Sequence, residues 1–101
     1  MVVYEIEISR AALEELAALR AFDEKRILEA IERQLTFAPT SPTRNRKLLA
    51  GAVPRFEAVP PIWELRLGEY RVFYDVSEAD LKVYVRAVRR KPPHKTLEEI
   101  L

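Results

Sequence analysis

Residues 63–76 read WELRLGEYRVFYDV, and this stretch decides the fold. Apolar side chains occupy every second position up to Leu67, and the same alternation resumes at Tyr70, after Gly68 and Glu69. An apolar period of two is typical of half-buried strands, and a two-residue connection with glycine first suits a tight hairpin turn. The stretch therefore predicts two antiparallel strands joined by a tight turn.

Further strands and helices are predicted on both sides of this hairpin. Residues 2–8 alternate in the same way and predict a first strand, and residues 81–87 predict a last one after a polar turn. The segments that follow Ser9 and Asp23 carry apolar side chains at helical spacing, with these two residues as N-caps. The short link between them predicts an antiparallel helical hairpin. Residues 96–101 predict a short C-terminal helix.

Together these elements predict an α+β fold in the order β-α-α-β-β-β, as one domain spanning residues 1–101. The helical hairpin is expected to pack on one face of an antiparallel sheet. Residues 39–61 contain five prolines and predict a long connection, whose conformation the pattern leaves open. The opposite sheet face is expected to stay open and to carry the remaining side chains of the strands: Glu64, Arg66, Arg71, Phe73, Asp75, Lys82, Tyr84 and Arg86.

Composition excludes several kinds of site. The chain has no cysteine, which excludes disulfides, thiolate metal sites and thiol nucleophiles. Glycine occurs only at Gly51 and Gly68, too few for a Gly-rich phosphate loop, and His94 is the single histidine. The acidic residues show no ligand spacing, so we expect no metal and no other cofactor. With no apolar run near the roughly 20 residues of a membrane span and no signal peptide, we expect a cytoplasmic protein without membrane contact.

Positive charge is concentrated in two segments although the formal net charge is only +1. Five of the residues 86–95 are basic and none is acidic, and a smaller cluster lies at residues 44–47. Such patches attract phosphate backbones, although a basic run can also be a plain solvated surface. The two clusters and the basic sheet face predict RNA binding through Arg44, Arg46, Lys47, Lys82, Tyr84, Arg86, Arg89 and Arg90. Tyr84 is expected either to stack on a base or to pair across strands with Phe73.

The hairpin at residues 63–76 resembles the signature hairpin of the RelE/ParE family of bacterial toxins. Residues 44–48, residues 83–91 and the order of elements match the family's layout as well, so the resemblance covers nearly the whole chain. It implies the toxin of a type II toxin–antitoxin system, neutralised by a cognate antitoxin that wraps around it. In one branch of the family the toxin cleaves mRNA on the ribosome, and in the other it inhibits DNA gyrase without cleaving nucleic acid.

For this chain the basic sheet face and the region of His94 favour the first branch, a ribosome-dependent mRNA endoribonuclease that blocks translation without a metal. Arg71 matches the family arginine that contacts the scissile phosphate, and Arg66 matches a basic position on the preceding strand. Lys91 lies where the nuclease branch has a second arginine, and His94 is the expected proton-transfer group. Residues 94–97 lack the tyrosine of many nuclease members. This difference leaves open a gyrase inhibitor, or a decayed member that only binds its antitoxin.

Two features have two interpretations each. Glu64 suits either a general base or an ion pair across the hairpin with Arg71 or Arg66. The apolar residues of the C-terminal turn at 96–101 suit either ordinary core packing or a movable segment that an antitoxin displaces.

Overall fold

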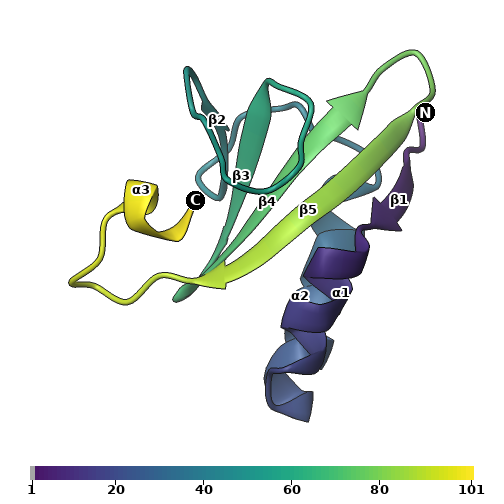
Figure 1. Cartoon of the computed structure of the whole chain (residues 1–101). Helices are drawn as coiled ribbons and strands as arrows, with labels where there is room; N and C mark the ends of the chain where they lie inside the picture. Colours follow the sequence, from purple (N-terminus) through teal and green to yellow (C-terminus); the bar gives the residue numbers. More distant parts are fainter. Residues whose placement is uncertain (1) are drawn as a thin grey trace.

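A five-stranded sheet in the order β1-β5-β4-β3-β2 forms the centre of the computed structural model, which describes residues 2–101 (Figure 1). The strands are β1 (Glu5–Ile8), β2 (Arg46–Leu49), β3 (Ile62–Leu67), β4 (Tyr70–Ser77) and β5 (Lys82–Arg90). The helices are α1 (Arg10–Ala17), α2 (Ala21–Leu35) and α3 (Leu97–Ile100). β1 runs parallel to β5, and the other neighbouring strands are antiparallel. The predicted α+β fold is confirmed, with β2 as an additional strand formed inside the long connection.

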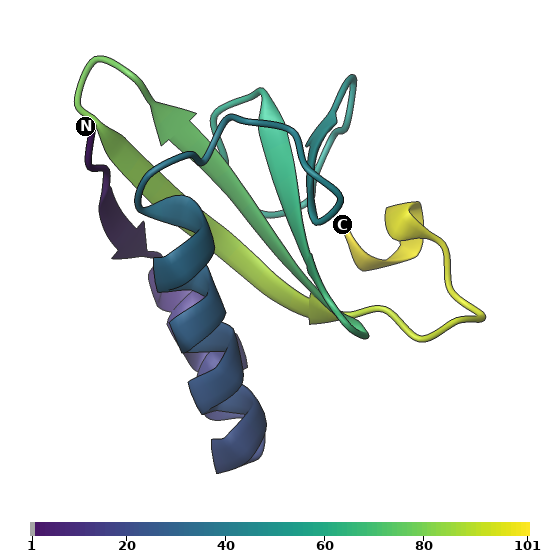
Figure 2. The same ribbon diagram turned by 180° about the vertical axis from the view of Figure 1, so that it is seen from behind.

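Helices α1 and α2 lie together on one side of the sheet (Figure 2). The Ser9 side chain accepts a hydrogen bond from the backbone N–H of Ala12 at 3.1 Å, which confirms this N-cap. The prediction that Asp23 is an N-cap is wrong, because α2 begins at Ala21 and Asp23 lies in its first turn. There its buried carboxylate accepts from the Tyr70 hydroxyl at 3.2 Å and so ties the helix to the β3–β4 hairpin.

The main core fills the space between the helical hairpin and the sheet. Each fully buried aliphatic side chain stabilises the fold by about 1.5–3 kcal/mol, so this layer dominates folding. Trp63 stacks on Tyr74 with ring centroids 6.3 Å apart, and both side chains are buried in this core. The other buried members of this core are Ala12, Leu16, Ile27, Ile31, Leu35, Leu65, Val72, Val83, Val85 and Val88.

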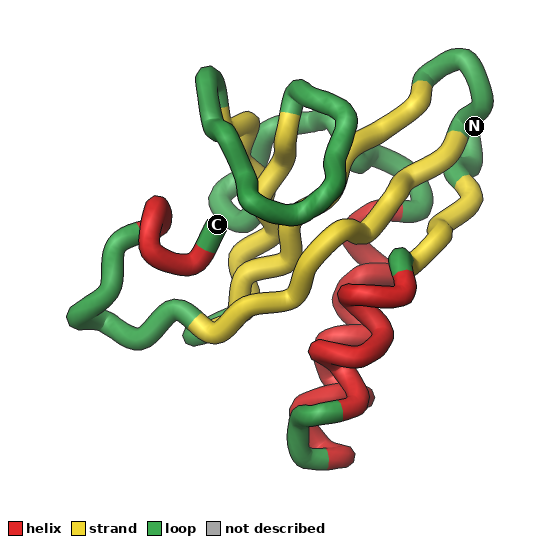
Figure 3. The backbone as a smooth tube through the Cα atoms, in the orientation of Figure 1, coloured by secondary structure: helices red, strands yellow, loops and turns green. Residues whose placement is uncertain are grey.

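The opposite face of the sheet is covered, so the prediction of an open face is wrong. The connection between β2 and β3 passes across the strands, and α3 packs beside it (Figure 3). Both segments place apolar side chains on this face, which creates a second, smaller core. Its buried members are Leu49, Ile62, Phe73, Ala87 and Ile100, and the partly buried ones are Ala52, Phe56, Ala58, Leu97 and Leu101. The proline-rich connection lacks regular periodicity, and its covering role is therefore invisible in the sequence pattern.

A β-bulge at Arg86 explains why Ala87 joins this second core. Tyr74 pairs with Val85 and Phe73 pairs with Ala87, so Arg86 is an extra residue on β5. The extra residue shifts the alternation by one, and residues after it exchange faces relative to a regular strand. The predicted parity of β5 therefore holds up to Val85 and is wrong at Ala87.

Polar anchors attach the long connection to the rest of the molecule. The Tyr74 hydroxyl donates to the Pro39 carbonyl at 2.6 Å, and burial raises the pKa of this tyrosine. The Asp75 carboxylate, only 3% exposed, accepts from the backbone N–H of Val59 at 3.0 Å. Because these acceptors and donors are buried, each bond is costly to leave unmade. In the described part of the chain, no helix is long and apolar enough to cross a membrane.

Candidate functional site

Three arginines form a row across the sheet at the end nearest the β3–β4 turn. Arg66 on β3 pairs with Arg71 on β4, and Arg71 pairs with Arg89 on β5. Cross-strand partners have Cβ atoms about 5 Å apart and share one face, so the three arginine side chains start from one side of the sheet within a short span. Arg66 is exposed, Arg71 is buried and Arg89 is partly exposed. Two of the predicted catalytic residues and one predicted RNA-binding residue thus lie together.

Arg71 is the most buried member of this row, with an exposed fraction of 6%. Its Nη1 donates to the carbonyl oxygens of Gly68 at 2.6 Å and Tyr70 at 2.8 Å, which draws the guanidinium over the turn. Gly68 has φ +59, the positive value that its predicted turn requires. Arg71 Nε lies 3.9 Å from Glu64 Oε2 without a hydrogen bond, which confirms a loose ion pair. Burial, and then the charge of Arg66, lower the pKa of Arg71, whereas Glu64 raises it.

Arg89 is oriented by contacts on both sides of β5. Its Nη1 lies 2.7 Å from Glu15 Oε2 on α1, and its guanidinium lies 5.7 Å from the centre of the Phe56 ring. The second oxygen of Glu15 accepts from the backbone N–H of Val88 at 3.0 Å, along the part of β5 that β1 leaves unpaired. Arg89 Nε, like Arg71 Nε, is buried and has no hydrogen-bond partner in the described structure.

The two unpartnered Nε–H groups define what this row can do chemically. An unsatisfied buried donor costs roughly 1–3 kcal/mol, more when it is charged. An anion with several oxygens, such as a phosphate, matches the planar fork of an arginine and would offset the positive charge of this row. Within residues 2–101, no three His, Asp or Glu side chains gather in the way that a metal site needs.

Lys91 and His94 lie beyond the end of β5. The backbone N–H of Lys91 donates to the Glu69 carbonyl at 2.6 Å, which extends the pairing of β5 past its last residue. His94 is exposed in a turn where Lys95 N–H donates to the Pro92 carbonyl at 3.0 Å. Among the described residues, no hydrogen bond or ion pair joins either side chain to Arg71.

Four of the predicted RNA-binding arginines are engaged by partners within the chain: Arg89 by Glu15, and Arg46, Arg86 and Arg90 as follows. Arg46 Nη1 donates to the backbone and side-chain oxygens of Gln34, both at 2.8 Å, and its Nε donates to the Ser41 carbonyl. Arg86 Nε donates to Asp75 at 2.7 Å, and this hydrogen bond raises the pKa of Arg86. Arg90 donates to Glu69 at 3.1 Å. Arg44, Lys47 and Lys82 form no ion pair within residues 2–101.

The aromatic ring of Tyr84 contacts the guanidinium of Arg86. The Arg86 guanidinium lies 4.8 Å from the ring centre, a cation–π contact on one face of the aromatic system. The alternative of a cross-strand pair with Phe73 is wrong, because Tyr84 pairs with Asp75. Phe73 stacks on Phe56 of the connection instead, with centroids 5.8 Å apart.

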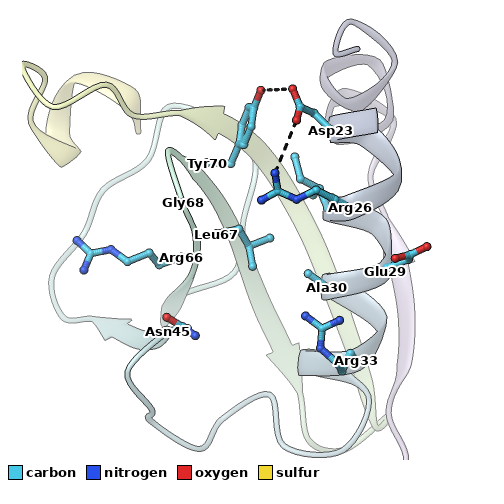
Figure 4. Close-up of a pocket in the computed structure, with 11 residues that line it drawn as sticks. Asp23, Arg26, Glu29, Ala30, Arg33, Asn45, Arg66, Leu67, Gly68 and Tyr70 are labelled. Atoms are coloured by element: carbon cyan, nitrogen blue, oxygen red, sulfur yellow. Dashed lines mark hydrogen bonds and ion pairs between the residues drawn. The ribbon is translucent and has the colours of Figure 1, made fainter. Parts of the chain in front are cut away.

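Sequence reasoning missed a cleft between α2 and the β3–β4 hairpin, shown in Figure 4. Its volume is about 460 Å³, and it is lined by residues of α2, the hairpin and Asn45. Arg26 and Arg33 point from α2 toward the hairpin, whereas Arg66 points away. In the sequence, this cleft could have been indicated by the seven-residue spacing of Arg26 and Arg33, which places both on one helix face.

The chain is similar to known bacterial toxins in its sequence pattern and in its fold. A family model described as the ParE toxin of the type II toxin–antitoxin system parDE matches residues 6–91. No curated protein sequence matches the chain significantly. Three solved structures share the fold at low sequence identity, and each was determined for a toxin or a toxin–antitoxin complex.

The RelBE2 complex of Mycobacterium tuberculosis matches with a TM-score of 0.71 and 20% identity, covering 89% of this chain and 100% of the other. The archaeal RelE–RelB complex of Pyrococcus horikoshii OT3 gives 0.69 and 22%, covering 92% and 99%. A mutant of the E. coli toxin RelE in the free state gives 0.66 and 20%, covering 87% and 83%. The family model spans well over half of the sequence, and the chain therefore belongs to the ParE toxin family of type II toxin–antitoxin systems.

Proposed function

We propose that this toxin is a metal-independent endoribonuclease that cleaves mRNA on the ribosome, with Arg71 and Arg89 as the phosphate clamp. The observation that carries the proposal is the pairing of Arg71 with Arg89 across β4 and β5, together with a buried Nε–H on each that has no acceptor among the described residues. Arginine suits a phosphate because its planar fork matches two oxygens and keeps its charge. The exposed Arg66 continues the row toward solvent.

In the proposed reaction the ribose 2′-hydroxyl is the nucleophile. Its oxygen forms a bond to phosphorus while the bond to the 5′-oxygen breaks, which leaves a 2′,3′-cyclic phosphate and a 5′-hydroxyl. Arg71 and Arg89 offset the negative charge that gathers on the phosphoryl oxygens, the type of interaction that most accelerates such steps. A proton leaves the 2′-oxygen and another reaches the 5′-oxygen, and His94 is assigned to this transfer, with Lys91 as the neighbouring cation.

Primer extension on cellular mRNAs after induction of the toxin tests this proposal. We expect new 5′ ends in messages from cells with the native toxin, and none from cells with Arg89→Ala. Arg10→Ala is the matched control, because Arg10 is exposed on α1 and pairs only with Glu14 at 3.8 Å. Intact messages in cells arrested by the native toxin would overturn the nuclease proposal.

Inhibition of DNA gyrase is the second candidate. It is favoured by the absence, among the described contacts, of any link between Arg71 and the side chains of Lys91 or His94. A toxin that binds without cleaving needs no proton-transfer group beside its arginines. Intact messages together with loss of supercoiling activity in a purified gyrase assay would identify this function.

The proposed partner in the cell is an antitoxin, because two of the three structures described above contain a toxin with its antitoxin. A short reading frame beside the gene is the expected source. Co-expression of that frame should restore growth, and a neighbouring protein that fails to bind the purified toxin would contradict the assignment.

A further inference from the structure

We propose that Glu15 and Phe56 are positioning residues that hold the Arg89 guanidinium from two sides and leave its Nε–Nη2 edge free for an oxyanion. Glu15 lies on α1, on one side of the sheet (Figure 2), and Phe56 lies in the connection on the other side (Figure 3). The oxyanion chemistry rests on the geometry of Arg89 alone, whereas the identification of the oxyanion as an RNA phosphate rests on the proposed nuclease function.

Glu15 is fixed because it completes the edge of β5. β1 pairs only with residues 82–85, so the rest of this edge has no neighbouring strand in the described chain. The Ser9 hydroxyl donates to the Arg86 carbonyl at 3.1 Å. Further along the edge, Glu15 Oε1 accepts from the Val88 N–H at 3.0 Å. Side chains of α1 and of its N-cap therefore replace a strand here, which holds the Glu15 carboxylate against β5.

The other carboxylate oxygen of Glu15 holds Arg89. Oε2 lies 2.7 Å from Arg89 Nη1. The carboxylate cannot follow a guanidinium that turns away without giving up its hydrogen bond to Val88. Because a partly buried backbone N–H is costly to leave without an acceptor, the Nη1 end of Arg89 stays beside α1.

Phe56 restricts Arg89 from the other side of the sheet. The guanidinium carbon of Arg89 lies 5.7 Å from the centre of the Phe56 ring, within the range of a cation–π interaction. The ring is itself fixed, because it stacks on the fully buried Phe73 with centroids 5.8 Å apart. A guanidinium held by a carboxylate and an aromatic ring loses rotamer freedom before a ligand arrives, so that binding costs less entropy.

The edge of Arg89 that remains is the one that suits a phosphate. Nε–H and one N–H of Nη2 point in the same direction and form a fork for two oxygens of one anion. Arg89 Nε has no partner among the described residues, and the side chain is 35% exposed, which lets an anion approach. Arg71 is arranged in the same way, because its two carbonyl contacts use Nη1 and its Nε is also without a partner.

The negative charge of Glu15 opposes anion binding, but water screens this partly exposed pair and limits the effect. The orienting effect is larger, since a free arginine must lose its rotamer entropy when it binds. The two effects have opposite signs. Removing the charge of Glu15 slows cleavage if Glu15 positions Arg89, and speeds it if Glu15 competes with the substrate.

Nuclear magnetic resonance with the isotope-labelled full chain tests the positioning directly. The Nε–H signal of Arg89 is identified by its absence from the Arg89→Lys spectrum, and inorganic phosphate should shift it. We expect Glu15→Gln and Phe56→Leu each to speed its exchange with water roughly tenfold or more and to weaken the response to phosphate. The glutamine keeps an oxygen for the Val88 N–H, which protects the fold. A native signal that phosphate leaves unshifted, or unchanged exchange in both variants, would overturn the proposal.

The matched controls are Glu14→Gln and Phe22→Leu. Glu14 is exposed on α1 and lies 3.8 Å from Arg10. Phe22 is 67% exposed, and the Arg26 guanidinium lies 5.7 Å from its ring centre, the same distance as at Phe56. Both controls should keep the exchange rate and the phosphate response within about twofold of the native chain. Equal changes in the controls would indicate a general loss of order and would contradict a specific role.

Single-turnover cleavage of mRNA on ribosomes, with toxin in excess, tests the role in the proposed reaction. Glu15→Gln and Phe56→Leu should each lower the rate roughly tenfold with little change in RNA affinity, and Phe56→Tyr should restore most of the rate because it retains the ring. In the Arg89→Ala background neither variant should slow the residual reaction further, because the group that they position is absent. Further slowing in that background, or faster cleavage by Glu15→Gln, would overturn the proposal. A native toxin that leaves mRNA intact would instead contradict the nuclease function and leave the phosphate response of Arg89 in place.

Discussion

Arg71 on β4 lies directly opposite Arg89 on β5, and the Nε atoms of both side chains are buried without a hydrogen-bond partner in the described structure. Like charges at opposed positions destabilise a sheet, and unsatisfied buried donors add to the cost. Glu64, Glu15 and the carbonyls of the β3–β4 turn offset part of it. The clustered positive charge at this end of the sheet therefore lowers the stability of the fold, as is expected where an anion binds.

Replacing Arg71 by alanine should abolish growth arrest. If the guanidinium stabilises a transition-state phosphate, its loss should lower the cleavage rate by on the order of a hundredfold or more. The fold should persist with a reduced free energy of unfolding, by roughly 1–3 kcal/mol, because two carbonyl contacts disappear and Glu64 loses its cation. Growth curves and denaturant unfolding measure both effects. A folded Arg71→Ala protein with full toxicity would remove Arg71 from the site.

Arg46 should prove to be a structural residue rather than a contact for RNA. Its guanidinium donates to Gln34 and to the Ser41 carbonyl, so Arg46→Ala should lower the free energy of unfolding by about 1–3 kcal/mol. Arg44→Ala, at an exposed neighbouring position, should change stability by less than about 0.5 kcal/mol. Urea unfolding of the two variants makes the comparison, and equal stabilities would contradict the assigned role.

The affinity for ribosomes or RNA should fall steeply as the salt concentration rises. Binding to phosphates releases counterions, so a substitution that removes one phosphate-binding cation should reduce the salt slope by about one unit. We expect this reduction for Arg44→Gln and Lys47→Gln, whose side chains have no internal ion pair in the described structure. Filter binding over a range of salt concentrations provides the slopes. A flat dependence for the native protein would indicate an apolar protein target.

Alkaline pH should destabilise the fold through Tyr74. Burial raises the pKa of this tyrosine above its ordinary value of 10.0, so the folded state favours the protonated form. The stabilisation is therefore complete below about pH 10 and is lost as the pH rises above that value. Tyr74→Phe should be about 1 kcal/mol less stable at neutral pH, since it lacks the bond to Pro39, but should lose less stability on going to alkaline pH.

Thermal unfolding between neutral and alkaline pH measures this difference. Tyr84→Phe is the control, because the Tyr84 hydroxyl makes no hydrogen bond in the described structure. Parallel losses of Tm in the native chain and in Tyr74→Phe would show that other groups cause the alkaline destabilisation.

The C-terminal helix α3 should exchange its amide hydrogens faster than the central strands. Ile100 is 9% exposed and belongs to the second core, but a single helical turn depends on its tertiary contacts for stability. Antitoxin binding should change the exchange of α3, because α3 covers one end of the sheet face that carries the arginine row. Equal protection of α3 and β4, unchanged by antitoxin, would identify the C-terminus as ordinary core.

Most of the fold could be predicted from local pattern. Alternation defined β1, β3, β4 and most of β5, and helical spacing defined α1 and α2, because each of these elements buries one side against the main core. β2 could not be predicted, since its four residues pair with β3 inside a proline-rich segment without alternation of its own. The covering of the opposite sheet face could not be predicted either, because the proline-rich connection that covers it has no alternation of its own.

The row of arginines was predicted in part. The signature hairpin placed Arg66 and Arg71 side by side, and the structure adds Arg89 to them. Sequence alone could not distinguish free from engaged arginines, because Arg46, Arg86, Arg89 and Arg90 find their partners through tertiary contacts. The hydrogen bond that ties Asp23 to Tyr70 likewise spans two elements and leaves no local signal.

The extra residue on β5, Arg86, shifts the alternation of side chains along the strand by one position. Before it, the even-numbered positions face away from the helices, and after it the odd-numbered ones do, which is how Arg89 comes to share a side with Arg71. A β5 that kept Arg86 in a regular register without the bulge would turn Arg89 toward the helices and bring Val88 to the arginine side, whereas deleting Arg86 would leave Arg89 opposite Arg71. The positive charge of this sheet end thus depends on the bulge at Arg86 as much as on the identity of the residues that follow it.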